Sequence, residues 1–224
     1  MCDTSFIHSD QLFDRIADAL VDCGYIILSG ALPADLVGKL LERLHDLDDE
    51  DFKRAGIGRQ DDFQIDTSVR RDRIHWLQQA HPAEVEFLAW MDELRHALNR
   101  RLFMGLMDYE CHFASYGIGA FYKKHLDAFK LPTPLLQAQT QVSPLQSQPS
   151  RVLSTVLYLN PDWQVGDGGE LRLYDEDDAL VLETIAPEYG KLVIFLSEKL
   201  PHEVLVAKRE RHSIAGWFRV SGPT

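Results

Sequence analysis

The sequence contains few cysteines and no long apolar run. Its 224 residues include three cysteines, Cys2, Cys23 and Cys111, and no two of them form a CxxC pair. An odd and widely spaced set argues against a disulfide framework or a structural zinc cluster, and it fits a reducing compartment. No apolar run approaches the roughly 18–20 residues that a membrane-spanning helix needs, and the first residues lack the pattern of a signal peptide. We therefore expect a cytoplasmic protein that does not bind a membrane.

Positive charge is also scarce. Lys and Arg total 23 against 35 Asp and Glu, so the formal net charge is −12. This balance argues against general nucleic-acid binding, which needs clustered Lys and Arg against the phosphate backbone. Apolar residues make up 45% of the chain and charged residues 26%, ordinary values for a globular protein. The length fits one domain with a full-sized core.

The first part of the chain has the periodicity of amphipathic helices. Apolar stripes predict helices over about residues 9–24, 33–44 and 82–102. A short buried strand is expected at residues 25–28. The polar stretch at residues 46–73 holds several arginines among many acids, and it is predicted to be a long loop.

After Met107 the period of the apolar residues changes from 3.6 to 2. Eight strand-like runs separated by Gly, Pro and Asp turns favour a β-sandwich or jelly roll. We expect the preceding helices to buttress one sheet, which places the fold in the α+β class. The strand-like runs cover residues 109–115, 121–126, 152–159, 170–174, 180–184, 191–196, 203–207 and 213–220.

One segment departs from the composition of the rest. Residues 130–150, KLPTPLLQAQTQVSPLQSQPS, contain four of the ten prolines and five glutamines. This composition predicts an inserted flexible loop. It is either a tolerated surface insertion or a lid or partner-binding loop, because it leaves the predicted barrel beside the motif that carries the chemistry.

That motif is the H-x-D pair of His125 and Asp127. Residues i and i+2 of a strand point to the same side, so the imidazole and the carboxylate would converge. His202, at the start of another strand-like run, completes a set of two histidines and one carboxylate. On one face of an octahedral Fe(II) ion, such a set leaves three positions open, enough for a bidentate keto acid and oxygen.

An arginine follows the distal histidine. Arg211 lies nine residues after His202, and adjoining strands would let it point into the same barrel. A guanidinium binds a carboxylate bidentately and keeps its charge, so Arg211 is a candidate anchor for the far carboxylate of a dicarboxylic keto acid. Arg209 is the competitor for this role, and we expect it to be a solvated surface charge.

Five ordered segments resemble one enzyme family. The sequence is similar to the Fe(II)/2-oxoglutarate-dependent dioxygenases, in particular to prolyl 4-hydroxylases of the hypoxia-inducible-factor type and their bacterial relatives. The resemblance implies one domain over residues 1–224, with helical support and a mobile loop in 1–106 and a double-stranded β-helix (jelly-roll) core in 107–220. The segments are VRRDRIHWL (69–77), SYGIGAFYKKHLD (115–127), RVLSTVLYLNPDW (151–163), GDGGELRLY (166–174) and PHEVLVAKRERHSIAGWF (201–218).

The resemblance implies roles for the metal and co-substrate residues. Arg211 would hold the far carboxylate of 2-oxoglutarate, assisted by the hydroxyl of Tyr158. Tyr116 would contact the end of the keto acid near the metal, and Trp217 would pack against the pocket. The residues that would bind Fe(II) are His125, Asp127 and His202.

Other residues are implied on the substrate side. Tyr122 would line it, and Arg151 would lie at the pocket mouth. The segment that resembles the mobile loop closing over a peptide contributes Arg70, Asp72 and Trp76.

The reaction implied by the resemblance is hydroxylation of a prolyl residue of an intracellular protein at its 4-position. O2 and 2-oxoglutarate are consumed, succinate and CO2 are released, and L-ascorbate (vitamin C) is the expected reductant of the iron. The bacterial relatives suggest a translation factor such as elongation factor Tu as the protein partner.

Three alternatives stay open at this point. The first is a dioxygenase acting on a small molecule or free amino acid. The second is a jelly-roll binding module without catalysis. The third is a cupin-like zinc or manganese barrel, which would not need Arg211.

Overall fold

The computed structural model describes residues 4–55, 68–128 and 150–221. The inserted loop predicted at residues 130–150 lies outside these residues, apart from Ser150. The α-helices in the described residues are α1 (Thr4–Asp22), α2 (Ala34–His45) and α3 (Pro82–Leu102), and a 3-10 turn, η1, covers Asp49–Asp51. No helix among the described residues is both long and apolar enough to cross a membrane. The strands are β1 (Tyr25–Ser29), β2 (Lys53–Arg54), β3 (Arg73–Trp76), β4 (Asp108–Tyr116), β5 (Tyr122–His125), β6 (Ser150–Tyr158), β7 (Leu171–Tyr174), β8 (Val181–Ile185), β9 (Lys191–Leu196), β10 (His202–Val204) and β11 (Arg211–Val220).

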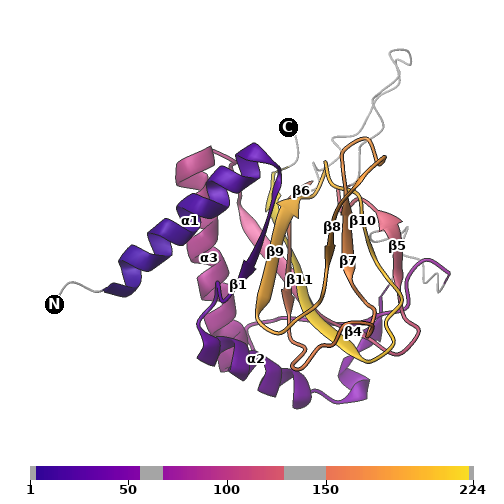
Figure 1. Cartoon of the computed structure of the whole chain (residues 1–224). Coiled ribbons are helices and arrows are strands. Elements are labelled where there is room, and N and C mark those ends of the chain that lie inside the picture. Colours follow the sequence, from indigo (N-terminus) through magenta and orange to yellow (C-terminus); the bar gives the residue numbers. More distant parts are fainter. Residues whose placement is uncertain (1–3, 56–67, 129–149, 222–224) are drawn as a thin grey trace, which may run out of the picture.

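The strands form two sheets. The larger sheet has the order β1-β9-β6-β11-β4-β3-β2, and the smaller has the order β5-β10-β7-β8. Every strand pairing in them is antiparallel. The helices lie along one side of the larger sheet, and the smaller sheet lies on its other side (Figure 1). The predicted α+β fold, a jelly roll buttressed by N-terminal helices, is confirmed.

Two apolar clusters hold these layers together. The helix-side core includes Leu40 of α2 and Phe218 of β11. The barrel core lies between the two sheets and includes Phe195 of β9 and Leu173 of β7. Because side chains alternate along a strand, β11 sends Phe218 toward the helices and Arg211 toward the barrel interior. The larger sheet therefore contributes side chains to both cores. Polar side chains on its inner face can contact a ligand in the barrel.

Elements in the polar stretch and in one strand-like run differ from the sequence prediction. Within residues 46–73, predicted as a loop, the structure has η1 and β2, and β2 pairs with β3. Residues 73–76 fell at the edge of the polar stretch that was predicted as a loop, but they form β3, which pairs with β4. Only Ile74 and Trp76 of β3 are apolar, and Arg73 and His75 alternate with them, so the short strand gives a weak signal in the sequence. The run predicted at 203–207 is the shorter strand β10, which begins at His202.

A glycine of β11 makes room for a hydroxyl on the helix side. A Cβ at Gly216 would overlap the Tyr109 hydroxyl and would lie 2.7 Å from the Cys111 Cβ. The Tyr109 hydroxyl bonds Thr155 Oγ1 at 2.7 Å. We predict that Gly216→Ala lowers the free energy of unfolding by about 1–3 kcal/mol, the usual cost of overpacking a core. Urea denaturation followed by circular dichroism measures this change.

Gly38→Ala in α2 is the matched control. Its Cβ would meet only the Tyr189 hydroxyl, at 3.9 Å, and alanine favours a helix over glycine by about 1 kcal/mol. This variant should be at least as stable as the wild type. Equal unfolding free energies for Gly216→Ala and the wild type would contradict the steric argument.

Candidate active site

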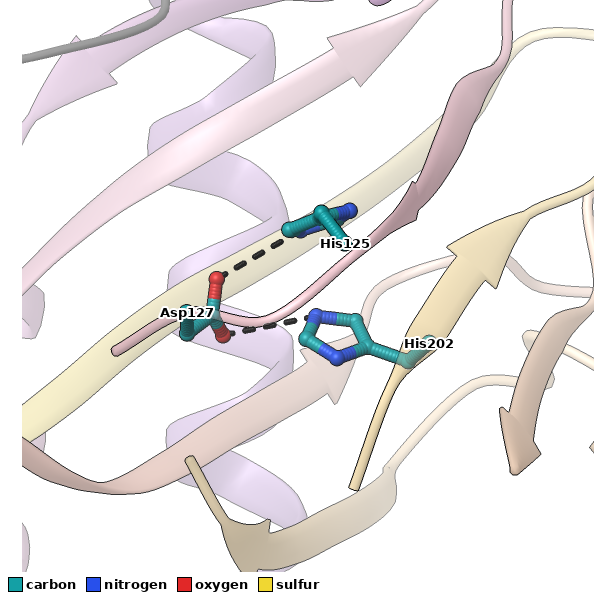
Figure 2. Close-up of side chains that lie close together, drawn as sticks. All are labelled: His125, Asp127 and His202. Atoms are coloured by element: carbon teal, nitrogen blue, oxygen red, sulfur yellow. Dashed lines mark ion pairs between the residues drawn. The ribbon is translucent and has the colours of Figure 1, made fainter. Parts of the chain in front are cut away.

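Two neighbouring strands of the smaller sheet carry the three predicted metal ligands. β10 runs antiparallel to β5, and His202 is the direct register partner of His125. Asp127 follows two residues after the end of β5. One ligand atom from each residue lies within 4.8 Å of the other two, and the two carboxylate oxygens of Asp127 each face one imidazole ring (Figure 2). The fold thus brings together the three side chains that the sequence pattern singled out.

Each histidine is oriented through its Nδ1 atom. His125 Nδ1 lies 2.7 Å from the Lys123 carbonyl oxygen, and His202 Nδ1 lies 3.1 Å from that of Leu200. A carbonyl oxygen only accepts hydrogen bonds, so each Nδ1 carries a proton, and Nε2 is the ring nitrogen that offers a lone pair to a metal once its own proton is lost. The Nε2 atoms lie 3.5 Å and 3.4 Å from the two carboxylate oxygens of Asp127. Backbone bonds therefore turn both Nε2 atoms toward the position of a metal.

Neighbouring charges and burial shift the pKa of each of the three residues. Burial alone raises the pKa of Asp127, but the neighbouring His202 and His125 outweigh it and hold that pKa well below its usual value. Burial lowers the pKa of His125, and the His202 charge lowers it further. For His202, the Asp127 carboxylate outweighs burial and raises the pKa. The carboxylate is therefore ionised and able to bind a cation.

A serine that the sequence analysis missed binds this carboxylate, and a second serine binds the first. Ser154 Oγ donates to Asp127 Oδ2 at 2.7 Å, and Ser197 Oγ lies 2.8 Å from Ser154 Oγ. Ser154 is on the inward-facing side of β6, four residues before Tyr158. The alternation along β6 is the signal that could have placed Ser154 in the interior.

The donor set fits a divalent transition metal. Two imidazole nitrogens and one carboxylate oxygen facing a common point form the set associated with non-haem Fe(II) and open coordination positions. His125, Asp127 and His202 are therefore the residues that could hold the predicted iron.

A buried cation lies in the same interior. Arg211 is 1% exposed and makes no ion pair with any residue that the structure describes. Its Nε donates to the Gly169 carbonyl at 2.9 Å, and its Nη1 donates to Ser213 Oγ at 3.2 Å. Both partners are neutral, so the positive charge is uncompensated. Because a buried unpaired charge is costly, this guanidinium is suited to an anionic ligand.

Two tyrosines flank the guanidinium. Arg211 Cζ lies 4.7 Å from the ring centre of Tyr116 and 5.1 Å from that of Tyr158. The buried Tyr158 hydroxyl has no hydrogen-bond partner among the described residues. Burial raises the pKa of both tyrosines, so each keeps its proton and can donate. A guanidinium beside an unpartnered phenol fits the carboxylate of the predicted 2-oxoglutarate.

Arg209 does not compete for this role. Its side chain is 42% exposed and forms an ion pair with Asp167 at 3.3 Å. Arg209 also lies over the ring of Trp163 at 4.9 Å. It is the solvated charge that the sequence led us to expect.

A stack of side chains supports His125 from outside the metal cluster. The Tyr122 ring is stacked on the His125 ring at 3.6 Å between centres. Arg70 Cζ lies 4.4 Å from the Tyr122 ring centre. Arg70 in turn makes a bidentate ion pair with the buried Asp72, at 2.8 Å and 2.6 Å. Two of the residues predicted for the substrate side, Arg70 and Asp72, are thus tied to each other and to a third, Tyr122.

A second aromatic group includes the remaining predicted residues. Arg151 Cζ lies 3.6 Å from the ring centre of Trp217, and Glu110 holds Arg151 through bonds of 2.8 Å and 3.0 Å. His112, which the sequence analysis did not single out, lies 5.0 Å from the Trp76 ring and 5.4 Å from the Trp217 ring. Burial lowers the pKa of His112 to about 4, so it is neutral at physiological pH.

Comparisons with known proteins point to the same superfamily. The family model described as the 2OG-Fe(II) oxygenase superfamily matches residues 111–219. A crystal structure of a prolyl-4-hydroxylase from Pseudomonas putida is 38% identical, covers 93% of this chain and 99% of that chain, and has a TM-score of 0.78. A prolyl hydroxylase from Trichoplax adhaerens, in complex with a hypoxia inducible factor oxygen degradation domain peptide fragment, is 22% identical and has a TM-score of 0.77. It covers 98% of this chain and 94% of that chain, and it shows the shared fold.

A curated relative matches a shorter region. The hypoxia-inducible factor prolyl hydroxylase of Caenorhabditis elegans is 33% identical over 104 residues, which are 46% of this chain and 12% of that protein. The chain spans 12–15% of the length of the curated relatives that it matches.

The uncompensated Arg211 predicts a ligand-dependent stability. With Mn(II) present, 2-oxoglutarate at about 100 times its Kd should stabilise the wild type by about 2.7 kcal/mol. Arg211→Met should lose most of this gain, because the guanidinium is gone. Without ligand, the same variant should be as stable as the wild type or more stable, since it removes a buried unpaired charge. Thermal unfolding with and without 2-oxoglutarate measures both effects.

Arg209→Met is the control, because it removes a nearby arginine that is exposed and already paired. It should keep the full ligand-induced gain. A gain of equal size in Arg211→Met would show that the guanidinium does not hold the acid.

Proposed function

The chain belongs to the 2OG-Fe(II) oxygenase superfamily, and on this basis we propose that it hydroxylates a prolyl residue of a protein at the 4-position. The reaction would consume 2-oxoglutarate and O2 and release succinate and CO2. The observation that carries the proposal is a His-Asp-His cluster in the same interior as a buried guanidinium that has no carboxylate partner in the part of the chain that the structure describes. The Pseudomonas putida relative, a prolyl-4-hydroxylase 38% identical to this chain, supports the substrate class.

Iron would be held by His125, Asp127 and His202. Bound Fe(II) supplies the oxidising chemistry in such enzymes, and the protein supplies ligand geometry and placement. The Nδ1 bonds of both histidines fix the rings with Nε2 toward the carboxylate. We propose L-ascorbate as the reductant that restores Fe(II).

The co-substrate would lie against the larger sheet. Arg211 would hold the far carboxylate of 2-oxoglutarate, and the protonated Tyr158 would donate a second hydrogen bond. Tyr116 would contact the end of the acid near the metal, and Trp217 would close the pocket with its ring. Since Arg211 is buried, water would compete poorly for these bonds.

The substrate side would be formed by Tyr122, Trp76 and Arg151, with the Arg70–Asp72 pair holding Tyr122 in place. A cavity of about 390 Å³ adjoins this pair, and four of its lining residues are arginines: Arg54, Arg70, Arg71 and Arg73. Its acidic lining residues are Asp72 and Glu210. Arg70 is paired with Asp72 and Arg73 with Asp49, so this lining would offer guanidinium hydrogen bonds to a peptide substrate without a large net positive charge.

We further propose that residues 1–224 act as one dioxygenase domain in the cytoplasm. Residues 1–106 would supply helical support and the substrate loop, and residues 107–220 would supply the catalytic core. A translation factor such as elongation factor Tu is the proposed target.

Turnover of 2-oxoglutarate tests the activity. Purified protein with Fe(II), ascorbate and air should form succinate, and a desalted cell lysate or proline-containing peptides should stimulate it. His125→Ala should lower the rate by more than about 100-fold, since outer partners of metal ligands alone cost 10–100-fold. His96→Ala, at an exposed site on α3, is the control and should leave the rate unchanged.

The compound that stimulates 2-oxoglutarate turnover distinguishes the proposed activity from a small-molecule dioxygenase and from a binding module. Stimulation by free proline or metabolites but not by peptides would indicate a small-molecule dioxygenase. No turnover from protein that binds iron would indicate a binding module.

Mass spectrometry tests the proposed target. Elongation factor Tu incubated with the protein and isotope-labelled O2 should gain one labelled oxygen on a prolyl residue, and His125→Ala should abolish the gain. If lysate proteins other than elongation factor Tu gained the label, the activity would stand and the target would be wrong.

A further inference from the structure

The metal-binding carboxylate has a hydrogen-bond partner on the opposite sheet. Asp127 follows β5 of the smaller sheet, whereas Ser154 belongs to β6 of the larger sheet. Ser154 Oγ donates to Asp127 Oδ2 at 2.7 Å, a short distance typical of a hydroxyl bound to an ionised carboxylate. Ser154 is 1% exposed, so water does not replace this contact.

A second serine fixes the first. Ser197 Oγ lies 2.8 Å from Ser154 Oγ, and Ser197 is fully buried. A serine hydroxyl has one proton, and Ser154 gives its proton to an acceptor-only carboxylate, so Ser197 must be the donor between the two hydroxyls. The Ser197 backbone N–H also donates to the Val152 carbonyl at 2.9 Å. The result is a directed chain from Ser197 through Ser154 to Asp127.

We propose that Ser154, oriented by Ser197, is a positioning residue that occupies Oδ2 of Asp127 and leaves Oδ1 as the single oxygen offered to the metal. This inference rests on the proposed function. An unrestrained carboxylate can bind a metal through both oxygens. A second oxygen would take one of the positions that the keto acid and O2 require, so the serine chain keeps the site open.

The serine chain also acts across the interior. The smaller sheet positions all three metal ligands, and Ser154 of the larger sheet binds their carboxylate, with Ser197, one residue after β9, holding Ser154. The contact therefore sets where the metal cluster lies relative to Arg211, which belongs to the larger sheet as well.

Metal binding without turnover tests the role. Mn(II) titrations followed by electron paramagnetic resonance should show Kd about 10–100-fold higher for Ser154→Ala than for the wild type, the range typical of outer partners of metal ligands. Ser154→Thr keeps the hydroxyl and should lose less than about 10-fold, the lower end of that range. Ser197→Ala should weaken binding less than Ser154→Ala does, because it leaves the direct bond in place.

Cobalt reports the ligands at the metal. A second carboxylate oxygen would replace a water on Co(II) and change the symmetry of its ligands, so the Co(II) absorption bands of Ser154→Ala should differ from those of the wild type and of Ser154→Thr. Thr155→Val is the matched control. It removes the neighbouring buried hydroxyl of β6, which bonds Tyr109 on the helix side, and should lower the melting temperature without changing Mn(II) affinity or the Co(II) spectrum.

The results separate this inference from the proposed function. Wild-type Mn(II) affinity and Co(II) bands in Ser154→Ala, or equal losses in Thr155→Val, would overturn the role of Ser154. If His125→Ala also bound Mn(II) like the wild type, the metal site itself, and with it the proposed function, would fail.

Discussion

The antiparallel pairing of β5 with β10 is the constraint on which the site depends. It places His202 opposite His125, and on its other edge the same short strand pairs with β7, where His202 lies opposite Leu173. A strand paired on both edges cannot slip by one residue without turning its side chains to the other face. The relative position of the two histidines is therefore fixed by backbone hydrogen bonds. The Nδ1 contacts to the Lys123 and Leu200 carbonyls then settle the direction of each ring.

The two buried charged residues of the interior, Asp127 and Arg211, have different surroundings. Asp127 is surrounded by two imidazoles and the Ser154 hydroxyl, so its negative charge is stabilised before any metal arrives. Arg211 has only a carbonyl and a hydroxyl as partners. In a chain of net charge −12, a dianionic ligand meets a repulsive long-range field. The uncompensated guanidinium therefore has to provide the local attraction, at a depth where the low dielectric strengthens it.

The sequence allowed the fold class and two converging ligands to be predicted from short-range patterns, whereas His202, 75 residues after Asp127, was predicted from its place at a strand-like run and from the family resemblance. Alternation after Met107 marks the strands, and the i, i+2 spacing of His125 and Asp127 puts them on one side. Other features depend on strands that are distant in the chain. Nothing near Ser154 in the sequence indicates that its hydroxyl meets Asp127, and β3 becomes a strand only because β4 offers it an edge. His112 was missed because its two tryptophan neighbours come from different strands.

The division of the site between the sheets has an evolutionary consequence. Both histidines and Asp127 belong to the smaller sheet or follow it, whereas Arg211, Tyr158 and Tyr116 belong to the larger one. A substitution in one set does not alter the strands that position the other set. Descendants of such a chain could lose the iron and remain as receptors for a small acid, or keep the iron and exchange the acid. Proteins of common ancestry can therefore differ in their chemistry after very few substitutions in this fold.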